Sequence, residues 1–198
     1  DFGVKLNISN GGPAPEIITN KIFKASQLLT SYKICKIQLP DFSEYGTYPY
    51  DETTLEIIDG LTDYSNLMEK IFDFDQISDF LKKDFSLIFD AMNAVTGPYA
   101  KNIFVEKMGL APDCVMNGNP LKDFGGLHPD PNLTYASHLA DLLLNKKSYS
   151  FGAACDGDGD RNMILGSGCF VNPSDSLAVI TANTKCVPGY KDGITGVA

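Results

Sequence analysis

Residues 151–162 have the sequence Phe-Gly-Ala-Ala-Cys-Asp-Gly-Asp-Gly-Asp-Arg-Asn. The small apolar run before the first aspartate predicts a buried strand, and three aspartates then occupy alternate positions. In an extended strand these positions would lie about 6–7 Å apart on one face, which is too far for three carboxylates to share one small ion. The chain must therefore curl into a tight loop, which the glycines at 157 and 159 permit.

The three aspartates, Asp156, Asp158 and Asp160, indicate a metal site. Carboxylates held this close together repel one another strongly unless a cation sits among them. Oxygen-only ligands favour magnesium, which is commonly shared between a few carboxylates and a substrate phosphate. Arg161 follows directly, and its guanidinium can pair with a carboxylate or hold a phosphate. A loop that leaves a strand end is a suitable place, because ligands of open α/β sheets bind beyond the carboxyl ends of strands.

Two other interpretations of this loop are less favoured. A plain surface turn is the usual meaning of one Asp-Gly pair, but three aspartates directly after a buried strand are unusual for a turn. A calcium EF-hand requires glycine at loop position 6 and glutamate at position 12. Those positions hold Arg161 and Ser167 here, which excludes the EF-hand.

The loop at 151–166 matches the sequence pattern of one known family. Four further segments match the same family and occur in the same order along the chain: residues 7–16, 71–74, 123–136 and 170–176. The chain resembles the α-D-phosphohexomutases from residue 2 to about residue 183. In particular, it resembles phosphoglucomutase of the eukaryotic type, and the ciliate phosphoglucomutase-like parafusins are candidates for closer relatives.

The resemblance implies an enzyme that interconverts glucose 1-phosphate and glucose 6-phosphate through a phosphoserine and glucose 1,6-bisphosphate. It implies Mg²⁺ on the three aspartates, and Arg161 holding phosphate or orienting the loop. Lys5 matches a family lysine near the reacting phosphate, so it is a second candidate catalytic residue. On residue type alone, a solvent-facing strand lysine would be preferred at that position.

Several parts that the family uses are absent from the sequence, including the Thr-Ala-Ser-His-Asn-Pro phosphoserine loop and the Gly-Glu-Glu-Ser sugar loop. We therefore expect the chain to be inactive alone, and its partners to be a phosphosugar substrate and further domains of the same polypeptide. The alternative is a non-catalytic metal- or phosphate-binding relative with a regulatory role. A phosphoserine loop elsewhere in the polypeptide would favour the enzyme.

The order of elements predicts an α/β fold with a mixed, mainly parallel sheet flanked by helices. We expect strands at 2–8, 54–58, 85–89, 112–116, 148–155, 162–165 and 169–171, and helices at 15–30, 61–72, 74–82, 97–107, 133–145 and 173–183. Residues 38–51 are expected to be an irregular linker. By resemblance, residues 1–45 end a first domain, 46–184 form the second domain, and 185–198 begin a third.

The charge and composition of the chain exclude some classes of function. The formal net charge of −9 argues against nucleic acid as a partner. It also requires any site for an anionic phosphosugar to be locally positive. No apolar run approaches the ~18–20 residues of a membrane span, and the start lacks a signal-peptide pattern.

The five cysteines form no Cys-x-x-Cys pair and are odd in number, so reduced thiols and a cytoplasmic location are expected. Cys155 adjoins the aspartates, whose charge should raise its pKa and keep it inert. His128 lies in the long loop at 118–131 and is expected to order that loop, whereas His138 is expected to be an ordinary helix residue.

Overall fold

The computed structural model describes residues 4–34, 36, 38–50 and 52–197. The chain divides into two compact units, residues 1–57 and residues 58–198.

The first unit contains one helix and one hairpin. The helix α1 (Glu16–Ser26) buries none of its residues. The strands β1 (Gly46–Tyr50) and β2 (Thr53–Ile57) pair antiparallel. The sequence therefore predicted β2 correctly, but the expected linker at 38–51 was partly wrong, because pairing with β2 orders β1 despite its weak pattern.

The strand expected at 2–8 is also wrong over its described part, residues 4–8. These residues form only an isolated bridge between Asn7 and Pro13. A strand is stabilised by its ladder to a partner, and the described residues offer this segment a single bridge. Residues 2 and 3 lie outside the described part of the chain.

The second unit alternates helices and strands. Its first elements are α2 (Gly60–Ile71), α3 (Phe74–Leu81), β3 (Leu87–Asp90), α4 (Thr96–Ala100), the π-helical η1 (Lys101–Lys107), η2 (Pro112–Cys114) and β4 (Val115–Met116). They are followed by η3 (Phe124–Gly126), α5 (Ser137–Ala140), the π-helical η4 (Asp141–Asn145), β5 (Phe151–Cys155), β6 (Asn162–Gly166) and β7 (Cys169–Val171). The last elements are α6 (Pro173–Ala182), η5 (Thr184–Cys186) and η6 (Pro188–Tyr190).

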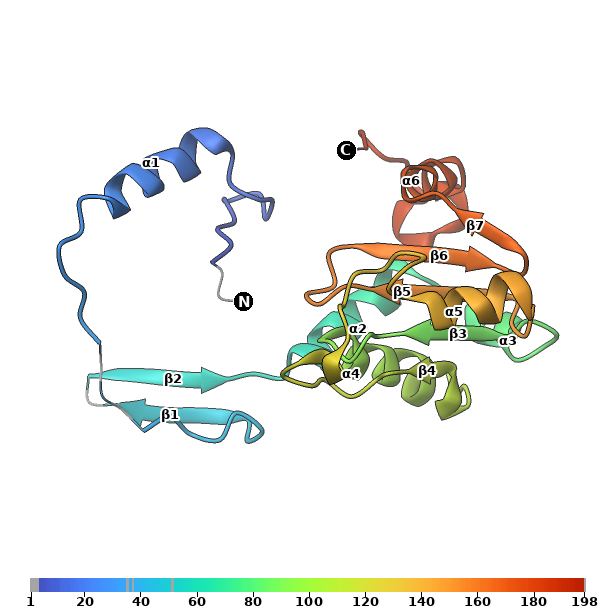
Figure 1. The fold of residues 1–198 in the computed structure, drawn as a ribbon, viewed down its shortest axis with the longest axis horizontal. Coiled ribbons are helices and arrows are strands. Elements are labelled where there is room, and N and C mark those ends of the chain that lie inside the picture. Colours follow the sequence, from blue (N-terminus) through green and yellow to red (C-terminus); the bar gives the residue numbers. More distant parts are fainter. Residues whose placement is uncertain (1–3, 35, 37, 51, 198) are drawn as a thin grey trace. The chain divides into compact units, whose positions relative to one another are not determined.

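The five strands of this unit form one mixed sheet in the order β4-β3-β5-β6-β7 (Figure 1). β3 is parallel to both β4 and β5, while β6 is antiparallel to β5 and to β7. Among the described strands of this sheet, β6 alone therefore runs against the others. This arrangement confirms the predicted α/β class with a mixed, mainly parallel sheet.

Alternating side chains of the sheet serve two different faces, as the two-residue period of a strand requires. Ile88, Ala154, Met163 and Leu165 join the core that α5 and η4 cover, where Leu139 and Leu143 are fully buried. A Cβ on Gly152 would lie 2.8 Å from Leu143 Cδ2, so glycine lets this helix approach β5 closely. On the opposite face, the rings of Phe89 and Phe104 pack at 5.9 Å.

The parallel strands of the sheet begin at one edge, the amino edge, and end at the opposite edge, the carboxyl edge. The carboxyl edge holds the ends of β3, β4 and β5, and the amino edge holds their beginnings together with the turn between β6 and β7. Among the described residues, none of the helices combines the length and the apolar character needed to cross a membrane.

Candidate metal centre

The loop between β5 and β6, residues 156–161, closes tightly at the carboxyl edge of the sheet. The Asp156 N–H donates to Arg161 O at 3.2 Å, and the Gly159 N–H donates to Asp156 O at 3.3 Å. Gly159 has φ +81°, a left-handed conformation that glycine adopts without strain. Gly157 has no left-handed φ, and a Cβ there would make ordinary contacts, so only one of the two predicted glycines is needed for the curl.

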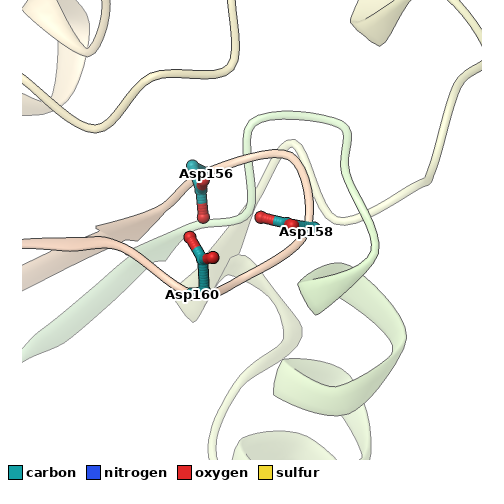
Figure 2. A group of neighbouring side chains, drawn as sticks. All are labelled: Asp156, Asp158 and Asp160. Carbon is teal, nitrogen blue, oxygen red and sulfur yellow. The ribbon is translucent and has the colours of Figure 1, made fainter. Parts of the chain in front are cut away.

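The loop brings the three predicted aspartates together. Their side chains point toward one another (Figure 2), and one carboxylate oxygen from each lies within 4.8 Å of the others. Neighbouring ligands of an octahedral magnesium ion with bonds of about 2.0–2.1 Å lie about 3–4 Å apart, so a small inward movement would bring the three oxygens to ligand spacing. Three hard oxygen donors at this spacing fit Mg²⁺.

The three carboxylates differ in their surroundings. Asp156 is 2% exposed, whereas Asp158 and Asp160 are exposed. Asp156 Oδ1 accepts a hydrogen bond from the Arg161 main-chain N–H at 3.0 Å, and Asp156 Oδ2 accepts one from Arg161 Nε at 2.9 Å. Asp156 thus belongs to the framework of the loop, and the other two carboxylates face solvent.

Arg161 links this loop to a second segment. Besides its bond to Asp156, its Nη1 donates to Asp130 Oδ1 at 3.1 Å, and its Nε lies 3.8 Å from Asp160 Oδ1. The hydrogen bond and the charge of Asp156, together with weaker effects of Asp130 and Asp160, raise the pKa of Arg161. The guanidinium is therefore a permanent cation beside three acids.

Part of that guanidinium still faces solvent. Of its five N–H donors, the bonds to Asp156 and Asp130 use two, and no third hydrogen bond of this side chain is found within the described residues. The side chain is 62% exposed and borders a cavity of about 330 Å³ that Asn162 and Ser176 also line. Arg161 is moreover the sole arginine among the 198 residues, which otherwise use lysine. The position suits an anion that needs a planar two-pronged donor.

Loops after β3 and β4 lie beside the loop at 156–161. The chain leaves β3 for β4 on one side, whereas β5 lies on the other side of β3, so the strand order reverses between β3 and β5. Ligands of open α/β sheets bind at such a reversal. Thr96 Cγ2 would lie 2.8 Å from a Cβ on Gly159, so the two loops are packed directly together. A cavity of about 390 Å³ opens here, lined by Val95, Tyr99, Cys155 and Asp158 among others.

Two titratable groups near the loop have pKa values raised by burial. Burial, with a lesser effect of the Asp156 charge, raises the pKa of the Cys155 thiol to about 11. Its thiolate is then scarce at neutral pH, in agreement with the predicted inert thiol. Burial also raises the pKa of Asp90, although hydrogen bonds from Asn117 Nδ2 and the Met92 N–H, both 2.9 Å long, oppose that change.

Three further residues singled out from the sequence are Lys5, His128 and His138. Lys5 is an exposed residue of the first unit, and its place in the site stays a prediction. His128 packs its ring on Tyr135 at a centroid distance of 4.3 Å, and His138 is exposed on α5. Sequence reasoning missed Asp130, because nothing local to residues 128–132 shows that an arginine 31 positions later will reach it.

Comparison with known proteins identifies the fold. The sequence pattern of phosphoglucomutase/phosphomannomutase, alpha/beta/alpha domain II, matches residues 62–167, slightly more than half of the chain. The chain belongs to this family. The matched residues run from α2 to the turn after β6 and so include the three aspartates.

Individual relatives match the whole chain. It is 50% identical over 198 residues to a phosphoglucomutase of Rhizobium radiobacter and 50% identical over 200 residues to the chloroplastic phosphoglucomutase of Arabidopsis thaliana. The crystal structure of pp63/parafusin (phosphoglucomutase) from Paramecium, in its open form, matches 98% of the chain with a TM-score of 0.87 and 42% identity. The chain spans 36% of the Rhizobium protein, 32% of the Arabidopsis protein and 37% of the Paramecium chain.

Proposed function

We propose that this chain is part of a phosphoglucomutase and supplies its metal-binding loop. The polypeptide would interconvert glucose 1-phosphate and glucose 6-phosphate through a phosphoserine and glucose 1,6-bisphosphate. The observation that carries the proposal is the convergence of three carboxylates within 4.8 Å, next to one guanidinium, at the reversal point of an α/β sheet. Relatives named phosphoglucomutase at about 50% identity support it.

Asp156, Asp158 and Asp160 would hold Mg²⁺, which as a Lewis acid stabilises negative charge on a phosphoryl oxygen. Asp156 would act as the fixed ligand, since burial and two hydrogen bonds from Arg161 hold it in place. Asp158 and Asp160 would close toward the ion from the solvent side. Phosphoryl transfer depends mainly on positioning and charge neutralisation, which this loop is built to supply.

Arg161 would hold a phosphate with the donors that Asp156 and Asp130 leave unused. A net charge of −9 disfavours anions over most of the surface, so a local cation is needed wherever a phosphosugar binds. An exposed guanidinium fixed on one side and open on the other meets that need.

Other elements of the proposal depend on polypeptide beyond these residues. The phosphoserine, the sugar-reading groups and the contribution of Lys5 would come together only with further domains. The domain limits at 45/46 and 184/185 stay predictions. A cytoplasmic location is proposed as well, although relatives include chloroplastic proteins.

Metal binding can be tested on the chain directly. Mn²⁺, which substitutes for Mg²⁺ at oxygen sites, gives an electron paramagnetic resonance signal that reports the free ion. We expect one site on residues 1–198, and a loss of affinity of at least about 100-fold in Asp158→Asn, since even residues around a ligand shell are worth about 10–100-fold. The exposed Asp84 provides the control, because Asp84→Asn removes the same charge from a distant turn. Equal Mn²⁺ affinity in the two variants would exclude the metal site.

Turnover of glucose 1-phosphate distinguishes a phosphoglucomutase from a non-catalytic regulatory relative. Residues 1–198 with Mg²⁺ and glucose 1,6-bisphosphate should not turn over glucose 1-phosphate, since the Thr-Ala-Ser-His-Asn-Pro phosphoserine loop that would supply the nucleophile does not occur among them. The complete polypeptide should do so. Metal binding without turnover in the complete polypeptide would favour the non-catalytic relative, and turnover by the chain alone would show that the nucleophile lies within it.

A further inference from the structure

The cavity of about 390 Å³ beside the loop at 156–161 has no part in the proposed function. Two pairs of aromatic side chains line it. The rings of Tyr64 on α2 and Tyr99 on α4 meet edge to face with their centroids 5.2 Å apart, and the centroids of Phe89 and Phe104 are 5.9 Å apart. Rings that pack on one another hold each other in place, so these walls are preformed, as is usual for ligand pockets.

The cavity also has a hydrogen-bonding group that lacks a partner. Thr96 Oγ1 is buried and makes no hydrogen bond within the described part of the chain. The other buried side-chain atom of this kind there, Asn102 Oδ1, belongs to a residue that does not line the cavity, whereas Thr96 does. A buried hydroxyl without a partner is unfavourable, and a ligand that supplies one removes the cost. Thr96 therefore offers a polar contact in a mainly aromatic and aliphatic space.

The size and charge of the cavity limit what it can hold. A cavity of roughly 150 Å³ accommodates benzene, so this one has room for an aromatic ring with a substituent. Asp158 lines the cavity and is exposed, which places a negative charge at its boundary with solvent. On a chain of net charge −9, that carboxylate disfavours an anion such as a phosphosugar. The cavity therefore suits an uncharged molecule.

We propose that this cavity binds a small phenol-like molecule, an uncharged aromatic ring that carries a hydroxyl group. The ring would pack edge to face or offset against the aromatic walls, as aromatic pairs prefer. Its hydroxyl would bond Thr96 Oγ1, since a hydroxyl can both donate and accept. The site shares no residue with the cavity of about 330 Å³ that Arg161 borders, so it is distinct from the position proposed for phosphate.

The bound molecule should also oppose metal binding, and this part of the inference rests on the proposed function. Asp158 and Gly159 belong both to the cavity wall and to the loop that would hold the ion, and Thr96 Cγ2 would lie 2.8 Å from a Cβ on Gly159. The cavity exists while the carboxylate oxygens lie within 4.8 Å of one another, whereas the ion would draw them closer. A molecule that fills the cavity favours the wider spacing, so the two ligands should weaken each other by the same factor.

Two fluorinated probes, 4-fluorophenol and fluorobenzene, test the contact with the hydroxyl of Thr96. The probes differ only in their own hydroxyl group, and the phenol is uncharged at neutral pH because phenols titrate near about pH 10. The ¹⁹F NMR signal of each probe, followed as residues 1–198 are added, gives its dissociation constant. We expect 4-fluorophenol to bind about fivefold more tightly than fluorobenzene, the scale of one hydrogen bond.

The variant Thr96→Val removes the hydroxyl and keeps nearly the same side-chain shape. It should weaken binding of 4-fluorophenol about fivefold and leave fluorobenzene within about twofold, because only the phenol loses a bond. The control Thr19→Val makes the same change at an exposed position of α1 and should alter neither probe. If Thr96→Val changed both probes equally, or changed neither, the inference would be overturned.

The complete polypeptide should contain the same site. We expect it to bind 4-fluorophenol within about twofold of the affinity of residues 1–198, and Thr96→Val to cause the same loss. Binding to residues 1–198 but not to the complete polypeptide would mean that another part of the polypeptide fills the cavity, and would overturn the ligand site.

Titrations with Mn²⁺ distinguish a failure of this inference from a failure of the proposed function. Saturating 4-fluorophenol should weaken Mn²⁺ binding about fivefold, the lower end of usual coupling between two sites, and saturating Mn²⁺ should weaken phenol binding equally. If the phenol binds and Mn²⁺ does not, the proposed function fails and the ligand site stands. If Mn²⁺ binds and the phenol does not, the ligand site alone fails. If both bind without affecting each other, the coupling is overturned.

Discussion

Neighbouring strands of the five-stranded sheet are joined by neutral hydrogen bonds at the amino edge and by charged groups at the carboxyl edge. At the amino edge, Ser86 and Ser150 exchange hydrogen bonds in which the N–H of each residue meets the hydroxyl of the other, at 3.2 and 3.0 Å. The β6–β7 turn is held by neutral main-chain bonds from Ser167 to Ser150 and from Gly168 to Leu143. At the carboxyl edge, the comparable β5–β6 loop is held by the ion pair of Asp156 and Arg161.

Non-glycine residues with a left-handed backbone are also distributed unequally between the two edges. Four non-glycine residues in the carboxyl-edge loops, Met92, Asn93, Asn117 and Phe124, have φ between +49° and +55°, and Met92 is 1% exposed. The amino edge has one such residue, Lys147, which is exposed. Neutral hydroxyls and main-chain bonds are enough to join the strands, so the carboxylates and the strain at the other edge point to a function beyond folding.

The largest effect should come from removing one exposed carboxylate at the carboxyl edge. We expect Asp158→Asn to lower turnover of glucose 1-phosphate by the complete polypeptide at least about 100-fold, because a ligand of the ion is lost. The fold should survive, since Asp158 is exposed. The matched change at the amino edge is Ser167→Asn, which should leave turnover within about twofold. Full activity of Asp158→Asn without any new dependence on Mg²⁺ would contradict the assignment.

A second comparison uses one left-handed glycine from each edge of the sheet. Gly159 and Gly168 have φ +81° and +73°, so alanine at either position is strained by about 1–2 kcal/mol. A Cβ at 159 would also lie 2.8 Å from Thr96 Cγ2, a short and stiff side chain, whereas one at 168 would meet the flexible end of Lys147 at 3.1 Å. We expect unfolding free energies lower by about 2–3 kcal/mol in Gly159→Ala and about 1 kcal/mol in Gly168→Ala.

Urea denaturation followed by circular dichroism measures that difference. Mn²⁺ affinity adds an independent reading, because Gly159→Ala should also weaken the metal site, while Gly168→Ala should not. Equal losses of stability in the two variants would mean that the packing of Thr96 on the loop is unimportant.

A smaller effect is expected from the cation of the carboxyl edge. Arg161→Lys keeps the charge but loses the planar fork that bonds Asp156 and Asp130 at once. Turnover by the complete polypeptide should fall about tenfold, the scale of one lost charge-assisted hydrogen bond. At the amino edge, Lys147→Arg is the control and should change nothing. If Arg161→Lys were as active as the unmodified protein, Arg161 would serve only to balance the aspartates.

Local patterns in the sequence were sufficient for much of the fold. The helices at 61–72 and 74–82, the strand at 85–89 and the hairpin at 162–171 each have a clear period or turn residues, and the structure has α2, α3, β3, β6 and β7 there. β1 was missed, and the strand expected at 2–8 was wrong over its described residues 4–8, because whether such weak segments form strands depends on a partner elsewhere. Pairing is a tertiary property that a local period does not record.

Some residues of the candidate site could be predicted from the local sequence, and others could not. Asp156, Asp158 and Asp160 could be grouped from the sequence because one short loop carries all three. Asp130 and Thr96 could not, since they reach the loop only through the packing of β3, β5 and the segment before α5. Lys5 lies in the other unit, so its role remains a prediction that needs the complete polypeptide.

The smallest expected effect concerns Asp90, the buried acid where β3 ends at the carboxyl edge. Burial raises the pKa of Asp90, while Asn117, the Met92 N–H and the charge of His138 act against that rise. The folded protein therefore binds this proton more tightly than the unfolded chain does. The contribution of Asp90 to stability is fully present below the unfolded pKa of about 3.9, and it is lost as the pH rises through the folded value.

Asp90→Asn keeps the Oδ1 acceptor for both hydrogen bonds and cannot ionise. Relative to the unmodified chain, this variant should gain up to about 1 kcal/mol of unfolding free energy between pH 4 and pH 7, as measured by urea denaturation at each pH. Ser150→Ala at the amino edge carries no titrating group, so its difference from the unmodified chain should not vary with pH. A pH-independent difference for Asp90→Asn would show that the charge of Asp90 is compensated in the folded state, and that the carboxyl edge tolerates buried charge better than its hydrogen bonds indicate.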